Sequence, residues 1–595
     1  MSTKGVRYKQ YYDFGETQKE LYSKSKLGAD FKDLLEIILS EENIMLAYRN
    51  IKNNSGSKTK GSDGFQIIHL AEKNKEKFIF EIRDTLKQYK PKAIRRVYIP
   101  KPDGSKRPLG IPTIRDRLIQ QMFLQVLEPI CEAKFFNHSY GFRPLRSARH
   151  AVARVQTLIN INKLHYTVDI DIKGFFDNVN HNLLIKQLWN IGIKDKRVLA
   201  IIAKMLKAPI QNVGIPSKGV PQGGILSPLL SNVVLNDLDQ WIADQWETFE
   251  TRYKYSGNDA KIFNLKRTSK LKEGYIVRYA DDFRILARDY KTAWKWFHAA
   301  KNYLRDRLNL EISNEKSKVI NLRKRSSTFL GFKIKAIPKN KKWVAKTNVS
   351  DKKIEQIKLK LRKSIKDIQK HPLPETINRY NAVVLGTQQY FKYATHVVKD
   401  FEIIEFSLLR TLRNRLRKLS KYGYISVDKN TAYYRLYGDR KRKAYSIKNS
   451  GYLFPISAVK TSNNLNFSQS LNPYEIERKF HWDYELVKLM KANILNRTIE
   501  YLDNRLSKYS MQKGMCAITK IPLTADLVHC HHKVPISLGG TDKFDNLIII
   551  HKFVHRLIHA TELETINNYL KLLNLNTLQI RKLNQLRALC KLENI

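Results

Sequence analysis

The sequence predicts a multidomain protein of the α+β class, and three observations support this prediction. The chain has 595 residues, which is too many for one compact domain. Its hydrophobic fraction of 42% is ordinary for packed domains, so extensive disorder is excluded. Helical and strand-like hydrophobic patterns follow one another along the chain, which is typical of mixed structure.

The chain is also strongly basic. Lys and Arg number 108 and Asp and Glu number 55, which gives a formal net charge of +53 at pH 7. Such an excess requires a polyanion to neutralise it, and nucleic acid is the expected partner. The chain has four cysteines, no apolar run of the roughly 20 residues that span a membrane, and no apolar core of a secretory signal. We therefore expect a protein of a reducing compartment that is not secreted and does not associate with membranes.

Within the N-terminal region 1–90, residues 31–90 are predicted to be helical. Apolar residues recur at helical spacing from Phe31 to Leu39. The loop 55–64, rich in Gly, Ser and Lys, interrupts these helices. We interpret this region as an N-terminal extension and the start of the next domain.

Residues 91–335 alternate short β-rich runs with helical stretches, which predicts an α/β or α+β domain. The β-rich runs are 95–100, 166–172 and 274–280.

Residues 336–460 are predicted to contain amphipathic helices over 351–371 and 406–423, each with an apolar stripe and a basic outer face. An Asn- and Ser-rich stretch at 461–473 is expected to be a linker or long loop. The remaining regions are a linker and connector at 461–510, a small unit at 511–560 and a helical tail at 561–595.

Two β-rich runs carry acidic residues. Asp281 and Asp282 lie between apolar β-formers, which predicts a hairpin whose turn projects two carboxylates. Asp169 and Asp171 alternate with apolar residues, which places both on one face of a strand. If these strands are neighbours, the carboxylates converge.

Clustered carboxylates repel one another unless a divalent cation lies among them, and Mg²⁺ binds a few carboxylates together with water and substrate phosphates. Two such ions about 4 Å apart activate a 3′-hydroxyl and stabilise leaving pyrophosphate, which is nucleotidyl transfer. An isolated acidic pair would more often be a solvated turn.

The segment Tyr279-Ala280-Asp281-Asp282 resembles the YADD box of reverse transcriptases, and its neighbouring blocks follow that family's order. These blocks are RRVYIPKPDGSKRPLGIPT (95–113), SYGFRPLRSARHA (139–151), DIKGFFDNVNH (171–181), PQGGILSPLLSN (221–232), LNLEISNEKSKV (308–319) and FLGFKI (329–334). The GFRP, DIKG and PQGG blocks are most similar to group II intron and other bacterial reverse transcriptases. The resemblance implies a right-hand polymerase, with fingers and palm in 91–335 and a thumb and maturase region in 336–460.

The resemblance also implies the polymerase site. Asp171, Asp281 and Asp282 match the catalytic carboxylates that bind two Mg²⁺ ions, whereas Asp169 fits the family pattern less well and is not assigned. Deoxynucleoside triphosphates are the implied substrates, and the residues implied to bind them are Arg95, Lys101, Arg107, Phe176 and Gln222.

Each nucleotide-binding assignment has a structural alternative. Phe176 matches the bulky residue beneath the incoming sugar, but it or its neighbour Phe175 would also serve as a core aromatic. The three basic residues match fingers positions that grip the triphosphate, where the alternative is a solvated surface cation. Gln222 belongs to a turn near template and nucleotide, which has a purely structural alternative.

Residues 379–394 resemble, more weakly, the maturase segment of group II intron proteins. This resemblance implies that structured intron RNA binds the basic helices and that the protein assists splicing without supplying its chemistry. The cations expected to contact RNA are Lys358, Arg362, Arg410, Arg413 and Arg417. Any single one of them would otherwise belong to a solvated face.

The region 526–560 is rich in histidine. His531 and His532 end a β-like run, a Gly-Gly loop follows, and Asn546 is expected to open an apolar helix. His555 and His559 are four residues apart, so they share one helix face and can bind one metal ion.

This order resembles H-N-H endonucleases with their ββα-metal fold. The resemblance implies that His531, His555 and His559 bind one divalent ion, that His532 is the general base and that Asn546 orients it. The alternatives are that Asn546 is only a helix N-cap and that the histidines are structural.

Family members in this setting often carry two CxxC pairs that bind a structural zinc. Here Cys516-Ala517-Ile518-Thr519 and His551-Lys552-Phe553-Val554 occupy those places, so we expect no structural zinc. His551 is expected to pack or to replace a lost ligand.

Together these resemblances imply a group II intron reverse transcriptase and maturase with a DNA-binding region in 461–510. They also imply an H-N-H endonuclease in 511–560 that nicks DNA during retrohoming. Its expected partners are group II intron RNA and target DNA, and we expect a monomer or dimer in the bacterial cytoplasm or an organelle. The alternatives are a splicing-only maturase with vestigial enzymatic sites and a non-intron bacterial reverse transcriptase.

Overall fold

The structure is a computed structural model that describes residues 11–100, 104, 106–424, 431–438, 443–448, 450–475, 481–492 and 494–595. The chain divides into two compact units. The first unit comprises Met1–Phe135, Phe176–Val233 and Asn472–Ile595, and the second comprises Phe136–Phe175 and Val234–Leu471. The predicted fingers and palm region, 91–335, therefore contributes to both units.

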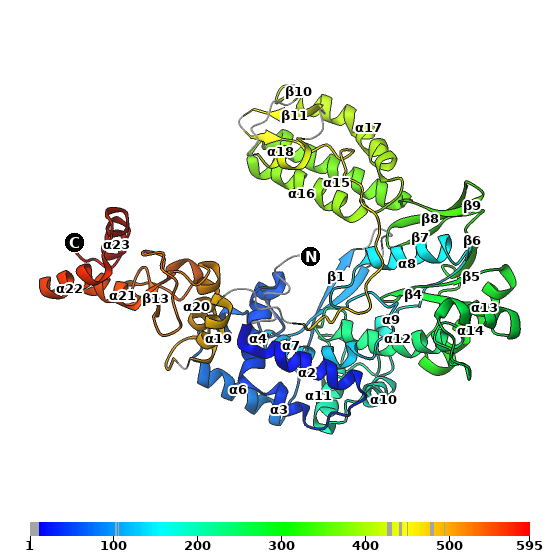
Figure 1. Cartoon of the computed structure of the whole chain (residues 1–595), viewed down its shortest axis with the longest axis horizontal. Helices are drawn as coiled ribbons and strands as arrows, with labels where there is room; N and C mark the ends of the chain where they lie inside the picture. The colour runs from blue at the N-terminus through cyan, green and yellow to red at the C-terminus, as the bar shows by residue number, and fades with distance from the viewer. Residues whose placement is uncertain are drawn as a thin grey trace. The chain divides into compact units, whose positions relative to one another are not determined.

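The N-terminal part of the first unit is helical, as predicted, and its buried helix α7 packs against α2, α3 and α4 (Figure 1). Its elements are η1 (Tyr11–Asp13), α2 (Phe14–Lys26), α3 (Leu34–Ile38), α4 (Glu41–Lys52), η2 (Ser55–Lys58), α5 (Ile68–Ala71), α6 (Lys75–Lys87) and α7 (Ile114–Glu132).

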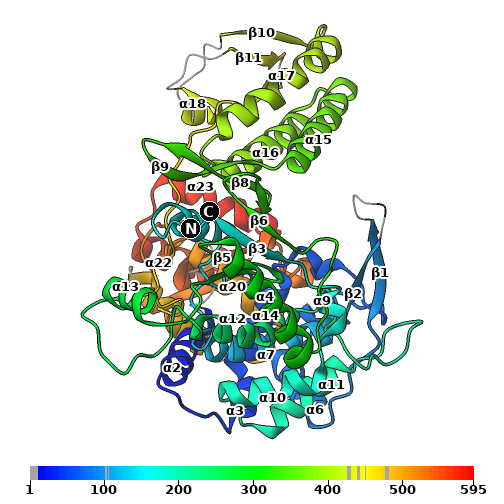
Figure 2. The ribbon, with the colours of Figure 1, turned by 90° about the vertical axis from the view of Figure 1, so that its right-hand side faces the viewer.

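Between α6 and α7 the chain forms an antiparallel hairpin of β1 (Arg95–Pro100) and β2 (Lys106–Ile111), which Figure 2 shows. The helices α10 (His181–Ile191) and α11 (Lys196–Leu206) complete the middle part of this unit.

The C-terminal part of the first unit begins with two helices and continues into a small α and β region. Its elements are α19 (His481–Lys491), α20 (Ile499–Met511), β13 (Val528–His532), η3 (Ile536–Leu538), η4 (Phe544–Asn546), β14 (Leu547–His551), α21 (Lys552–His559), α22 (Leu563–Leu573) and α23 (Thr577–Leu589).

The second unit contains a four-stranded antiparallel sheet in the order β4-β5-β3-β6. Helix α14 packs against β3, β5 and β6, and helix α8 packs against β4. The elements are α8 (Ala148–Asn160), β3 (Tyr166–Ile170), α13 (Asn258–Thr268), β4 (Tyr275–Tyr279), β5 (Asp282–Ala287), α14 (Tyr290–Leu308) and β6 (Lys318–Asn321). The short helix α9 (Phe175–Asn178) and helix α12 (Ser227–Asp244) contain points where the chain passes between the units.

A second sheet follows in the order β7-β8-β9, and then three long helices. These elements are β7 (Ser327–Phe329), β8 (Phe332–Lys339), β9 (Lys342–Val349), α15 (Asp351–Lys370), α16 (Pro374–Phe391) and α17 (Val397–Leu416). Helix α15 packs against both α16 and α17 (Figure 1) and buries the predicted apolar stripe, including Leu361 and Ile365. The helix predicted over 351–371 is thus confirmed as α15.

The helix predicted over 406–423 is correct only in part. Helix α17 begins at Val397 and ends at Leu416, and β10 (Ser420–Tyr424) follows. β10 pairs with β11 (Lys443–Ile447), which also pairs with β12 (Gly451–Tyr452), while α18 (Ala432–Tyr437) lies between β10 and β11 in sequence. Two tyrosines flank Gly423 in β10, and this composition favours a paired strand over continuation of the helix.

The described ranges contain no helix that combines the length and the apolar character required to cross a bilayer.

Candidate active sites

Strand pairing in the second unit brings the predicted carboxylates together. Asp281 lies in the turn between β4 and β5, and Asp282 is the first residue of β5. β3 pairs with β5 in a register that sets Ile170 opposite Phe283. Asp171 directly follows β3 at this end of the ladder, and its negative charge acts on Asp282. Residues from two separate sequence blocks therefore meet at one end of the sheet.

The electrostatics of Asp282 reflect this meeting. Burial against the protein, together with the negative charges of Asp169, Asp281 and Asp171, raises the pKa of Asp282 to about 6, although Arg284 opposes the shift. The side chain is still partly open to solvent. Binding of a divalent cation would relieve the repulsion, and carboxylate oxygens are ligands that Mg²⁺ prefers. The donor set therefore fits Mg²⁺.

Asp169 is engaged elsewhere. It forms an ion pair with Arg284 and accepts hydrogen bonds from Ser327 Oγ at 2.7 Å and Thr167 Oγ1 at 2.8 Å. It is only 8% exposed. These contacts give Asp169 a structural role.

A lysine that the sequence analysis did not assign also lies at this site. Lys316 Nζ is 3.5 Å from Asp171 Oδ2. The backbone N–H of Asp171 donates to Ser317 Oγ at 3.1 Å, so the segment that carries Lys316 also positions the carboxylate. Lys316 belongs to the block LNLEISNEKSKV, and membership of this block was the sequence feature that could have identified it.

A buried ion pair supports the turn that carries Asp281. The guanidinium of Arg278 lies 2.6 Å from the Asp239 carboxylate, and both side chains are fully buried. Arg278 also donates to the carbonyl of Ala280 at 2.9 Å. Ala280 has a φ of 58°, a conformation that is uncommon for a residue with a side chain. The ion pair thus holds a strained turn.

The first unit contains a cavity of about 370 Å³ that includes two of the predicted nucleotide-binding residues. Phe176 and Gln222 both line this cavity. Phe175 is buried at 3% exposure, which identifies Phe176 as the aromatic residue that faces the cavity. The other polar and glycine residues of the lining are Arg96, Gly110, Asp177, Lys218 and Gly219.

The basic residues predicted for the fingers lie on the β1–β2 hairpin. Arg95 is opposite Ile111, and Arg107 is opposite Ile99. The cavity lining contains Arg96, a residue that the sequence analysis did not assign, and contains neither Arg95 nor Arg107. Lys101 lies outside the described residues.

The cations predicted to bind RNA differ in their surroundings. Lys358 Nζ is 2.8 Å from Glu355, and Arg362 donates to the carbonyl of Ser407 at 3.5 Å, which links α15 to α17. The other three cations are exposed at spacings of three and four residues, with Arg410 and Arg413 on α17 and Arg417 as its C-cap residue. The α17 arginines therefore provide the open basic face.

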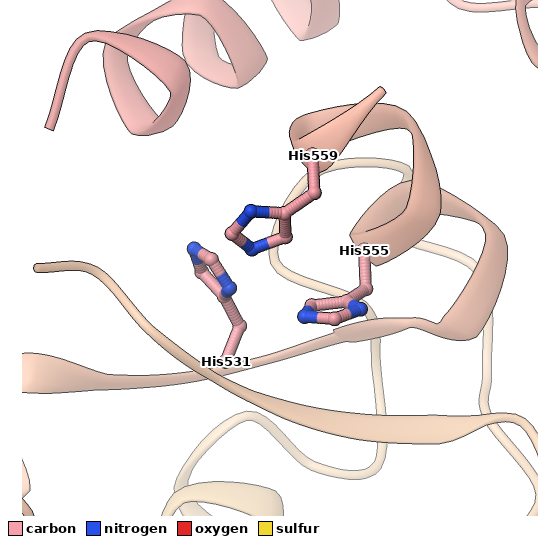
Figure 3. A group of neighbouring side chains, drawn as sticks. All are labelled: His531, His555 and His559. Carbon is pink, nitrogen blue, oxygen red and sulfur yellow. The ribbon is translucent and has the colours of Figure 1, made fainter. Parts of the chain in front are cut away.

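The predicted histidine ligands meet in the C-terminal part of the first unit. β13 pairs antiparallel with β14, and α21 follows directly. His531 of β13 and His555 and His559 of α21 point toward one another (Figure 3), and their candidate ligand atoms all lie within 4.8 Å of one another.

Burial keeps these imidazoles neutral. It is the main cause that lowers the pKa of His531 and of His555 to about 3, with smaller effects from neighbouring histidines. Burial and Arg587 lower the pKa of His559. His531 Nε2 is buried and has no hydrogen-bond partner. A divalent ion that prefers nitrogen ligands, such as Zn²⁺, would satisfy this atom, so the residues fit a metal.

His532, the predicted general base, and Asn546, its predicted orienting residue, have different hydrogen-bond partners. His532 Nε2 lies 2.7 Å from Asp542 Oδ1. The Asn546 side chain accepts from Val534 N–H and donates to the carbonyls of Val534 and Thr541, each at 2.9 Å. Asn546 thus braces the loop after His532, and Asp542 is the polar partner of the His532 ring.

The prediction that Asn546 opens a helix is wrong. Asn546 ends η4, and the apolar residues after it form the strand β14 because they pair with β13. The helix begins later, and His551 is its N-cap, with Nδ1 accepting from Phe553 N–H at 3.1 Å.

Cys516 is buried and accepts two backbone hydrogen bonds. Its Sγ accepts from the N–H groups of Thr519 at 3.4 Å and of His551 at 3.3 Å. Threonine and valine stand where the second ligand of each CxxC pair would be, so this donor set does not fit a four-ligand zinc.

Comparisons with known proteins find a family model that matches the part of the chain containing Asp171, Asp281 and Asp282. The sequence model of the family described as "Reverse transcriptase (RNA-dependent DNA polymerase)" matches residues 99–334. Protein YkfC of Escherichia coli (strain K12) is 34% identical over 303 residues, which cover 48% of this chain and 78% of YkfC.

Two further relatives have names that refer to introns. Group II intron-encoded protein LtrA of Lactococcus lactis subsp. cremoris is 32% identical over 359 residues, which cover 53% of this chain and 58% of LtrA. The putative COX1/OXI3 intron 1 protein of Saccharomyces cerevisiae is 26% identical over 584 residues, which cover 84% of this chain and 67% of that protein.

Proposed function

Because the chain belongs to the reverse transcriptase family, we propose that it copies RNA into DNA at Asp171, Asp281 and Asp282. The observation that carries this proposal is the β3–β5 register, in which Ile170 is opposite Phe283, so that Asp171 follows β3 at the end of the sheet where Asp282 begins β5. Bound Mg²⁺ ions would activate the primer 3′-hydroxyl and stabilise the leaving pyrophosphate.

The residues of the chain bind and position the substrates of this reaction. The carboxylates hold the ions, and the β4–β5 turn is fixed by Arg278 so that Asp281 keeps its orientation. Phe176 lies under the sugar of the deoxynucleoside triphosphate and excludes a 2′-hydroxyl. The positions that contact the triphosphate and the template are Arg95, Lys101, Arg107 and Gln222.

We further propose that the protein is a maturase for group II intron RNA. The name of LtrA and the exposed arginines Arg410, Arg413 and Arg417 support this proposal. Arginine side chains neutralise phosphate repulsion where structured RNA is closely packed, so binding stabilises the active fold of the intron. The splicing chemistry remains that of the RNA.

The histidine cluster supports a second enzymatic activity, the nicking of target DNA. His531, His555 and His559 would hold one divalent ion, which stabilises the charge that develops on the phosphate. His532 takes a proton from the attacking water, and Asn546 holds the loop that follows it. A nick of this kind would provide the 3′ end that the polymerase extends.

Primer extension with purified chain, an RNA template and Mg²⁺ tests the polymerase proposal. Asp281→Ala should abolish complementary DNA synthesis and leave RNA affinity unchanged, because the substitution removes a metal ligand and no phosphate contact. Asp259→Ala, which removes an exposed carboxylate at the start of α13, is the matched control and should retain synthesis.

Two results would contradict the proposal. Synthesis by the Asp281→Ala chain would show that the site is elsewhere. RNA binding without synthesis by the wild-type chain would favour a splicing-only maturase.

A further inference from the structure

Asp542 is the hydrogen-bond partner of His532, and it comes from the loop between β13 and β14. The distance between His532 Nε2 and Asp542 Oδ1 is 2.7 Å. The His532 ring also stacks on the ring of Tyr501, with centroids 5.3 Å apart and planes 20° apart. His532 is therefore fixed both at the edge and on the face of its ring.

Helix α20 holds Asp542 in place. Thr498, the N-cap residue of α20, donates its hydroxyl to the second carboxylate oxygen of Asp542 at 2.6 Å. Asn504 of the same helix donates to the backbone carbonyl of Asp542 at 2.8 Å. Each carboxylate oxygen of Asp542 thus has its own partner.

These contacts decide which nitrogen of His532 carries the proton. Burial opposes the ionisation of Asp542, but hydrogen bonds from His532 and Thr498 lower the pKa of the carboxyl overall. An ionised carboxylate only accepts hydrogen bonds, so His532 Nε2 must donate. The lone pair of the neutral ring is then on Nδ1.

Helix α20 is itself anchored to the N-terminal part of the first unit. Asp503 is 2% exposed and pairs with Arg49 of α4 at 2.7 Å and with Lys52 at 3.1 Å. The backbone N–H of Ile499 donates to the carbonyl of Lys73 at 3.0 Å. The helix that positions Asp542 and Tyr501 is therefore held at its first turn and at its middle.

We propose that Asp542 is a positioning residue of the C-terminal site, which fixes the tautomer and orientation of His532 so that Nδ1 accepts the proton of the attacking water. The inference rests on the proposed nuclease activity. A carboxylate in this position also stabilises the imidazolium that forms when the proton is taken, as a carboxylate does beside a general-base histidine in other hydrolases.

The test compares Asp542→Asn with the wild-type full-length chain in DNA-nicking assays run in parallel with Zn²⁺, Mg²⁺ and Mn²⁺. The asparagine keeps the size of the side chain, but its amide disfavours a protonated Nε2. The kcat for nicking should fall by about 100-fold or more, because a misoriented base loses its contribution, while KM for DNA stays unchanged. Asp545→Asn, an exposed carboxylate in the same loop, is the matched control and should nick at the wild-type rate.

A second measurement is independent of nicking. Long-range ¹H–¹⁵N spectra of the ¹⁵N-histidine-labelled chain report the tautomer of each ring, and the His532 signals are those absent from the His532→Ala chain. The wild-type signals should show a proton on Nε2, and Asp542→Asn should shift the population toward Nδ1–H.

The outcomes separate this inference from the nuclease proposal. Wild-type nicking that Asp542→Asn leaves unchanged, or a His532 ring with its proton on Nδ1 in the wild type, would overturn the role of Asp542. Absence of wild-type nicking together with Nε2–H in the spectra would remove the nuclease function, and with it the catalytic role, while the Asp542–His532 pair would stand.

Discussion

Gly141 shows how closely the block 139–151 approaches the YADD turn in the second unit. A Cβ at this position would collide with the backbone nitrogen of Ala280 in the β4–β5 turn. Backbone hydrogen bonds on either side, from Tyr140 N–H to Arg278 O at 2.9 Å and from Arg278 N–H to His138 O at 3.0 Å, prevent the segments from separating. Glycine is therefore required at position 141 by the geometry of the turn.

Gly141→Ala should reduce complementary DNA synthesis strongly while RNA affinity is unchanged. The added methyl group must displace the turn, and a displacement of about 1 Å at a catalytic group costs about 100-fold in rate. Primer extension measures the effect. Gly257→Ala, at a position where a Cβ would meet nothing within 4 Å, is the control; equal rates for the two variants would show that the turn is not under this constraint.

The positions of three site residues could be predicted from the sequence. Strand alternation and the YADD turn determine where Asp171, Asp281 and Asp282 lie. Others could not. Asp239 pairs with Arg278 from a distant helix, and Asp542 reaches His532 only because the loop folds back. Neither pairing has a local pattern, since both depend on tertiary packing.

At the scale of elements, the β13–β14–α21 region contains several histidines whose pKa is lowered by burial in the folded protein. Burial lowers the pKa of His531 and His555 to about 3 and of His529 to about 4, from 6.5. The folded region therefore binds fewer protons than the unfolded chain below pH 6.5, so its stability falls as the pH is lowered from 6.5 toward 4.

Hydrogen exchange on the metal-free chain measures this dependence. Amides of β13 and α21 should lose protection between pH 7 and pH 5, after correction for intrinsic exchange, and addition of Zn²⁺ should restore it because the metal binds neutral imidazole. Helix α15 contains no histidine and serves as the internal reference. Protection that does not change with pH or Zn²⁺ would contradict the metal assignment.

A buried ion pair between Arg49 and Asp503 joins helices α4 and α20. Arg49 and Asp503 are 6% and 2% exposed. Asp503→Asn would leave Arg49 buried without a counter-charge, and we expect a cost of about 3–5 kcal/mol, seen as loss of hydrogen-exchange protection in α20.

The double variant Arg49→Met with Asp503→Leu should recover much of this protection, because it replaces both buried charges by apolar side chains. If Asp503→Asn exchanges as slowly as the wild type, the pair contributes nothing to the anchoring of α20.

Element boundaries were predictable where apolar periodicity alone decides them, as in α15. They were not predictable where a partner strand decides them. The end of α17 and the strand character of residues 547–551 both depend on pairing with β11 and β13 respectively, which local periodicity does not report.

For the whole molecule, the net charge of +53 and the exposed arginines of α17 predict a strong salt dependence of RNA binding. Replacing Arg410, Arg413 and Arg417 together by Gln should lower the slope of log K against log salt concentration by about 2, because each lost phosphate contact removes about 0.7–0.9.

The control replaces three lysines of α14, which also removes three charges: Lys291, Lys295 and Lys301. Filter binding across a range of KCl concentrations compares the two variants. Equal slopes would show that RNA binding depends on the net charge of the whole protein and that the arginines of the α17 face make no specific contribution.

The division of the chain into two units could not be predicted from the sequence. The sequence suggests regions that succeed one another along the chain, whereas each unit is assembled from separated segments. The chain passes from one unit to the other near residues 135, 176, 233 and 472. The amino-acid composition does not change at these points, because they are ordinary helix and loop residues.

The pairing of Arg49 with Asp503 has a consequence for synthesis on the ribosome. The two residues are 454 positions apart, so translation at about 5–20 residues per second separates them by roughly 20–90 s. During that interval the guanidinium has no Asp503, and the surface of α4 that α20 will cover is open to water or chaperones. A polymerase truncated before α20 would keep that exposed surface permanently, so its tendency to aggregate should rise even though every residue of the carboxylate site is present.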